Sequence, residues 1–101
     1  MPDVTEPFGP TVLWHIRAAL NDDPPASLRA ITCSWDAHKV AIRCIFSKPL
    51  TVADQAAMDA IGLAITQALP RQVVDLECMV RSEEQALSDL KLMEWVYTRL
   101  G

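Results

Sequence analysis

The side chains of this chain that could perform chemistry are few, and their spacing matches no metal-binding or nucleophilic motif. The thiols and imidazoles are Cys33, Cys44, Cys78, His15 and His38. A structural zinc site would need such groups in paired motifs such as CxxC, and the cysteines here stand far apart on expected strands. The two histidines fall on an expected helix and in an expected turn. We therefore predict neither a metal nor another cofactor.

A nucleophilic pair is conceivable from Cys33 and His38, because one β-hairpin would carry both. Cys33 shares an apolar strand face with Ile31, however, and a thiol becomes reactive only in an electropositive, partly exposed setting. The carboxylate pairs at 22–23 and 83–84 lie in polar segments without an apolar pocket to raise a pKa. The three glycines are too far apart for a phosphate-binding loop. These absences predict a protein that is not an enzyme.

The charge balance argues against nucleic acid as a partner, and it fits either solubility alone or attraction to a basic partner. The 101 residues include thirteen Asp and Glu against nine Lys and Arg, which gives a net charge of −4. Such a chain repels phosphate backbones, and it attracts a basic protein, which mainly speeds association. Trp35 precedes Asp36 and Trp95 follows Glu94, whereas base-stacking surfaces interleave aromatic with basic side chains. We expect no nucleic-acid binding.

The sequence also predicts a cytoplasmic location. Three cysteines are an odd number without an evident disulfide framework, as is usual in a reducing compartment. Residues 1–10 carry two acidic side chains, no positive side chain and no apolar run, which does not resemble a signal peptide. No apolar run approaches the roughly 20 residues that a membrane span needs.

The first half of the chain predicts an arm, a helix and a hairpin. Residues 1–10 are rich in proline and read as an irregular arm. Apolar residues recur at helical spacing over residues 11–21, with Pro10 suited to the first turn. Residues 28–35 and 40–46 alternate between apolar and polar side chains on either side of a short polar turn, which predicts a β-hairpin.

The second half predicts a helix, a strand and one ambiguous element. Thr51 and Asp54 have the spacing of a capping box before a helix that runs to about residue 69, with a buried stripe that includes Ala64 and Ala68. Residues 72–81 alternate with a charged outer face, and residues 82–89 are polar. Residues 90–101 fit either a strand or a helix by their pattern.

Together these elements predict a single α+β domain over residues 11–101. The order is α-β-β-α-β, followed by a strand or a helix, and one domain is what a chain of this length can build. We expect two helices against an antiparallel sheet of three or four strands.

The order of local features resembles one family. It is carried by Leu28-Arg29-Ala30, Ser34-Trp35-Asp36, the alternating strand that follows, the acidic-capped helix, and the closing Glu94-Trp95-Val96-Tyr97-Thr98-Arg99. These features are similar to those of small immunity proteins of bacterial contact-dependent inhibition and related polymorphic toxin systems, over residues 12–101. The resemblance implies a cytoplasmic antitoxin that binds and blocks the C-terminal domain of a cognate toxin. It also favours a strand near the C-terminus and therefore four strands.

The sequence leaves two alternative functions from different classes. As an immunity protein, the chain would bind a basic toxin, expected to be a nuclease, as a monomer or weak dimer. The partner-binding surface would be the outer sheet face and nearby loops, with Asp36, Asp75, Glu77, Glu83, Glu84 and Glu94. The alternative is a small acidic adaptor or a dimeric, secretion-chaperone-like protein-binding domain, which would bury the apolar residues of the last segment in an interface.

Overall fold

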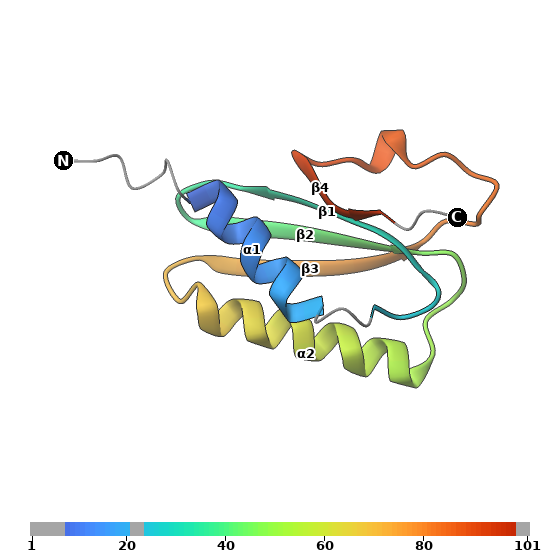
Figure 1. Ribbon diagram of the computed structural model, residues 1–101, viewed down its shortest axis with the longest axis horizontal. Coiled ribbons are helices and arrows are strands. Elements are labelled where there is room, and N and C mark those ends of the chain that lie inside the picture. The colour runs from blue at the N-terminus through green and yellow to red at the C-terminus, as the bar shows by residue number, and fades with distance from the viewer. Residues whose placement is uncertain (1–7, 21–23, 99–101) are drawn as a thin grey trace.

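The structure is a computed structural model that describes residues 8–20 and 24–98 (Figure 1). The elements are the helices α1 (Phe8–Leu20) and α2 (Val52–Ala68), the strands β1 (Leu28–Trp35), β2 (Lys39–Phe46), β3 (Val73–Val80) and β4 (Glu94–Thr98), and a 3-10 helix, η1 (Ser88–Leu90). Helix α1 begins at Phe8, within the expected arm, and residues 1–7 of that arm lie outside the described residues. The predicted order of helices and strands is confirmed.

The four strands form one sheet in the order β3-β2-β1-β4. Strand β1 pairs antiparallel with both β2 and β4, whereas β2 and β3 are parallel. The expectation of an antiparallel sheet is therefore wrong at β3, and the sheet is mixed. The physical reason is α2: a helix that connects two strands carries the chain back to the end where the first strand began, so the next strand runs in the same direction.

Both helices lie on one face of the sheet, as Figure 1 shows. The apolar side chains that β1 and β2 direct toward the helices are fully or almost fully buried: Ile31, Cys33, Val40, Ile42, Cys44 and Phe46. They pack with Val12 and Ile16 of α1 and with Met58 and Ile65 of α2. The alternation in the sequence predicted this face of the hairpin correctly. Among the described residues, no helix is long and apolar enough to cross a membrane.

The beginning of α2 confirms the predicted capping box. The Thr51 hydroxyl accepts a hydrogen bond from the Asp54 amide at 3.0 Å, and the Asp54 carboxylate accepts one from the Thr51 amide at 3.1 Å. The expected buried stripe of Ala57, Ile61, Ala64, Ile65 and Ala68 is correct at Ile61 and Ile65, which are buried, and wrong at Ala64 and Ala68, which are exposed. Met58 is fully buried in their place: the helix packs through its larger apolar side chains.

The ambiguous C-terminal element is a strand. Glu94–Thr98 pairs with β1 at the margin of the sheet opposite β3. The four-stranded sheet that the family resemblance implied is confirmed. Because β3 and β4 occupy opposite margins, the chain between them must pass from one side of the sheet to the other.

Candidate functional site

The outer face of the sheet, which lies opposite the helices, is partly covered by the segment that joins β3 to β4. We call residues 81–93 the crossing segment. Beneath it, Thr32 and Ile45 have no exposed surface, although the sequence pattern placed them on the solvent side. The Thr32 hydroxyl donates to the Glu94 carbonyl at 2.7 Å and accepts from the Leu92 amide at 3.0 Å. The expected open outer face is therefore reduced to the part near the β1–β2 turn and β3.

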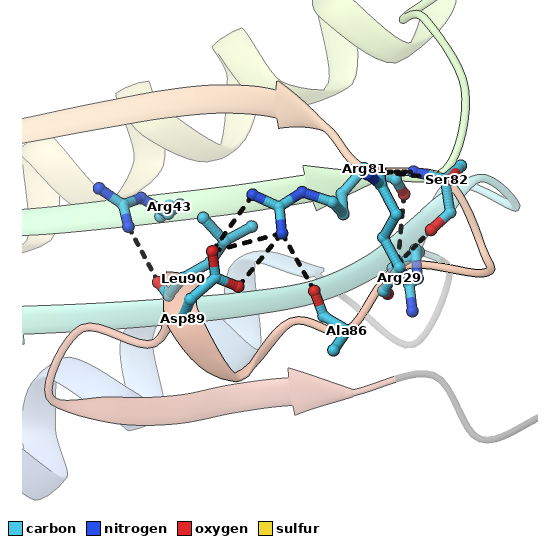
Figure 2. Close-up of polar contacts among 8 residues, drawn as sticks. Arg29, Arg43, Arg81, Ser82, Ala86, Asp89 and Leu90 are labelled. Atoms are coloured by element: carbon cyan, nitrogen blue, oxygen red, sulfur yellow. Dashed lines mark hydrogen bonds and ion pairs between the residues drawn. The ribbon is translucent and has the colours of Figure 1, made fainter.

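Two arginines of the sheet, Arg29 and Arg43, hold the crossing segment in place, and Arg81 makes contacts within the segment (Figure 2). One Arg29 nitrogen donates to the carbonyls of Arg81, Ser82 and Gln85 at 2.7 to 3.2 Å. Arg81 donates to the Ala86 carbonyl and to Asp89, both at 3.1 Å, and Arg43 donates to the Leu90 carbonyl at 2.9 Å. Sequence reasoning missed these roles, since an arginine that binds distant backbone carbonyls leaves no periodic signal.

Asp75 and Glu77 lie next to each other on the outer face of β3, as predicted. Each has a cationic neighbour on β2: Asp75 lies 3.5 Å from Lys39, and Glu77 lies 2.8 Å from Arg43. Both carboxylate side chains are more than half exposed, at 62% and 51%. Exposed pairs of this kind are weak, so the carboxylates stay available to a partner.

Asp36 lies in the β1–β2 turn, near the start of β3. Its carboxylate accepts hydrogen bonds from the backbone amides of His38 at 2.7 Å and Lys39 at 2.8 Å. These two bonds favour the charged form and hold the pKa of Asp36 below its usual value. The carbonyl of His38 in turn accepts from the Val73 amide at 2.8 Å, so the turn and the first residue of β3 are joined.

The other three predicted carboxylates lie elsewhere. Glu83 and Glu84 follow the far end of β3, and Glu83 lies 3.8 Å from Arg29. Glu94 begins β4 on the opposite margin, where its register partner is Cys33. An eight-residue strand is about 26 Å long, so the six side chains divide into three groups. Asp75 and Glu77 share the outer face of β3, and Asp36 lies in the turn that is joined to the first residue of that strand.

Two hollows border this group. One, of about 350 Å³, lies on the outer face and is lined by Ser34, Trp35, Asp36, Lys39, Ala41 and Met93. The other, of about 360 Å³, lies between α2 and β3, and we call it the edge groove. Its lining residues are Gln55, Met58, Asp59, Gly62, Leu63, Thr66, Val74, Leu76 and Cys78. Sequence reasoning did not anticipate the edge groove, which forms where an exposed side of α2 meets the outermost strand.

The cysteines are free thiols in apolar surroundings. Burial raises the pKa of Cys33 to about 11. Cys44 and Cys78 are register partners on β2 and β3. The hydrogen bond from Cys44 to Cys78 and burial both raise the pKa of Cys44, whereas the same hydrogen bond lowers the pKa of Cys78. Among residues 8–20 and 24–98, no three His, Cys, Asp or Glu side chains cluster closely enough to hold a metal ion.

The fold and this surface define a small α+β domain with exposed carboxylates beside a groove that has both apolar and polar lining residues. The chain belongs to the MafI2 immunity protein family, whose model matches residues 10–100. Maf toxins are polymorphic toxins, so the resemblance to immunity proteins of polymorphic toxin systems is confirmed. No curated protein in the comparison matches the chain.

Solved structures with a partly similar backbone include MamM CTD in a zinc form and in a copper form. The zinc form is 14% identical with a TM-score of 0.48 and covers 75% of this chain and 87% of that one. The copper form is 12% identical with a TM-score of 0.46 and covers 76% and 90%. Likeness at this level carries no argument about function.

Proposed function

We propose that this immunity protein binds the C-terminal domain of a cognate toxin and blocks it without catalysing a reaction. Membership of the MafI2 immunity protein family, over nearly the whole chain, carries the proposal. The surface near β3 supports it, because Asp36, Asp75 and Glu77 are exposed beside a groove in which the apolar side chains of Leu63, Val74 and Leu76 are accessible. Apolar contact with a charged rim is the usual composition of a protein–protein interface.

The toxin domain that we propose as partner is a basic nuclease. A nuclease binds the phosphate backbone in a positively charged cleft. The acidic chain, with a net charge of −4, supports electrostatic attraction to such a cleft. Carboxylates on β3 would then take the places of substrate phosphates or lie at the cleft's rim.

We place this encounter in the bacterial cytoplasm. The three cysteines are free thiols, and Cys44 and Cys78 lie opposite each other in the register without being joined. An odd number of cysteines without an evident disulfide framework supports a reducing compartment.

The immunity function is tested by expressing the toxin domain encoded beside this chain in bacteria, once alone and once together with the chain. We expect growth arrest by the toxin, rescue by the wild-type chain, and a stable complex on co-purification. Cleavage of DNA and RNA by the purified toxin, with and without the immunity protein, tests the nuclease proposal. A toxin that arrests growth without cleaving either nucleic acid would contradict it, and failure to bind or protect would contradict the immunity function.

The oligomeric state separates this proposal from a secretion-chaperone-like dimer. A chaperone of that kind requires an obligate dimer with an interface of about 2,000 Å² or more. We propose a monomer or weak dimer, which multi-angle light scattering over a range of concentrations would detect. An obligate dimer at every concentration would favour the chaperone alternative.

A further inference from the structure

Strand β3 presents an unpaired backbone edge to solvent. It is the outermost strand on its side of the sheet, and no further strand among the described residues pairs with it. The amides of Val73 and Arg81 donate inward, to the carbonyls of His38 and Phe46. Because strand geometry alternates with a period of two, the amides of Val74, Leu76 and Cys78 point outward.

This edge has few of the features that usually prevent strand addition. Edge strands are protected by shortness, proline, bulges or charged side chains, lysine above all. The charged side chains of β3 are Asp75 and Glu77, which repel an acidic strand but attract a basic one. Strand β4, on the opposite margin, is five residues long and its pairing contains a register shift. Strand β3 is eight residues long, pairs with β2 in continuous register, and contains no proline or lysine.

The edge groove lies along the same residues. Val74, Leu76 and Cys78 point their side chains into this groove, while their amides point to the free edge. On its other side the groove is bordered by Leu63 of α2, which is 59% exposed. A strand that paired with β3 would therefore place every second side chain beside the groove and the remaining ones beside Asp75 and Glu77.

The charges argue against a second copy of the chain as occupant. If two copies of the chain paired antiparallel through β3 about a two-fold axis, two registers would give the greatest overlap. One register places Asp75 opposite Glu77 of the copy, and the other places Glu77 opposite Glu77 of the copy. Like charges directly opposite each other destabilise a strand pair. The cationic neighbours Lys39 and Arg43 lie on β2, one strand further in, so the charges at the middle of the edge are acidic.

We infer that the free edge of β3 and the edge groove bind an extended segment of the toxin domain in which apolar side chains alternate with lysine or arginine. Main-chain hydrogen bonds to β3 supply affinity, and the alternate side chains supply selectivity. The inference rests on the proposed function and specifies the surface and the conformation by which the toxin is bound.

Amide hydrogen exchange, followed by NMR on the wild-type protein alone and with its toxin domain, tests the inference. In the free protein, the amides of Val74, Leu76 and Cys78 should exchange quickly. The inward amides of Asp75 and Glu77 provide the internal control, because β2 already protects them. Binding should slow the outward amides by roughly a hundredfold and leave the inward ones nearly unchanged.

A pair of variants on α2 tests the groove. Leu63→Gln should weaken toxin binding by roughly tenfold, because it removes an apolar contact. Val52→Gln is the matched control: Val52 is 90% exposed and does not line the groove, so binding should be unchanged. Both substitutions lie on exposed helix positions and should leave the fold intact.

The outcomes are distinguishable. If the wild-type protein does not bind the toxin, the proposed function fails and the inference fails with it. Binding that leaves the outward amides of β3 fast would overturn the inference alone. Protection of those amides in the free protein, increasing with its concentration, would identify a second copy as the occupant and would also overturn it.

Discussion

The Arg43 Nε donates to a Glu77 carboxylate oxygen at 2.8 Å. The same guanidinium donates through Nη1 to the Leu90 carbonyl at 2.9 Å, so one side chain joins the proposed binding strand to the crossing segment. The side chain of Arg43 is only 23% exposed, whereas that of Glu77 is 51% exposed. A partner that draws Glu77 into its own ion pairs would therefore compete with one of the two contacts that orient the Arg43 guanidinium, whose other contact holds Leu90 of the crossing segment.

Replacing Arg43 should loosen the crossing segment. Arg43→Ala removes the donors to Glu77 and to Leu90, and hydrogen bonds of charged groups contribute roughly 1.5–3 kcal/mol each when well shielded. We expect a loss of about 1–3 kcal/mol in the free energy of unfolding, measured by urea denaturation. Arg71→Ala is the control, because that exposed residue makes neither of these contacts, and it should change stability by less than about 0.5 kcal/mol. Equal stability of the two variants would show that these contacts contribute nothing.

Reversing the charge of Asp75 should weaken toxin binding with little effect on the fold. Asp75 has one neighbour, Lys39, and both side chains are more than half exposed, so Asp75→Lys should cost little stability. We expect association at about 0.05 M salt to slow by roughly tenfold and the difference to shrink at about 0.5 M, where the Debye length is near 4 Å. Stopped-flow fluorescence measures both rates.

Glu84→Lys makes the same charge change beyond the far end of β3 and serves as the control. Its effect on association should be several times smaller, because Glu84 lies past the end of β3 rather than on its outer face, and screening weakens the influence of a more distant charge. If the two variants slow association equally, long-range net charge rather than the β3 surface governs the encounter.

Much of the fold could be predicted because each element has a local cause. Alternation identified the hairpin, and the Thr51–Asp54 spacing identified the start of α2. Alternation alone did not show the parallel pairing of β2 and β3, since an alternating strand looks the same in either direction; the signal was the predicted helix that connects the two strands. The burial of Thr32 and Ile45 has a non-local cause, because the crossing segment covers them. No local pattern in residues 82–93 predicts that this segment packs on the sheet.

The candidate site was predictable only in its central part. Spacing of two correctly placed Asp75 and Glu77 on one face of a strand, but their ion pairs depend on which strand lies beside β3. The edge groove depends on how α2 packs, and this differs from the expected stripe at Ala64 and Ala68. Because α2 leaves the edge groove open over β3, Leu76 is only partly buried. The substitution Leu76→Ala should therefore lower the free energy of unfolding by less than it would at a fully buried position.

The β1–β2 turn should become less stable in acid. Two backbone amides donate to the Asp36 carboxylate and lower its pKa from the ordinary 3.8. A depressed folded-state pKa means that the stabilisation is present above the unfolded pKa and is lost as the pH falls through the folded pKa. Wild type should therefore exceed Asp36→Ala in melting temperature at pH 6, and the difference should narrow below about pH 4. Melting curves between pH 2.5 and 7 measure it, and a constant difference across this range would contradict the assignment.

The thiols should differ in reactivity in an order set by their surroundings. The thiolate is the reactive form, and the hydrogen bond from Cys44 lowers the pKa of Cys78. Cys78 is also only partly buried, whereas Cys33 and Cys44 are buried and have raised pKa values. At pH 8, iodoacetamide should therefore modify Cys78 first, as measured by mass spectrometry of peptides.

The variant Cys44→Ala removes the donor to Cys78 and should slow modification of Cys78, because its pKa then rises. Since Cys78 lines the edge groove, bound toxin should slow its alkylation as well. Free glutathione in the same tube serves as the control, because its alkylation rate reports any loss of reagent. Modification of Cys33 before Cys78 would show that burial does not set the order. Unchanged alkylation of Cys78 in a saturated complex would show that the groove stays open when the toxin is bound.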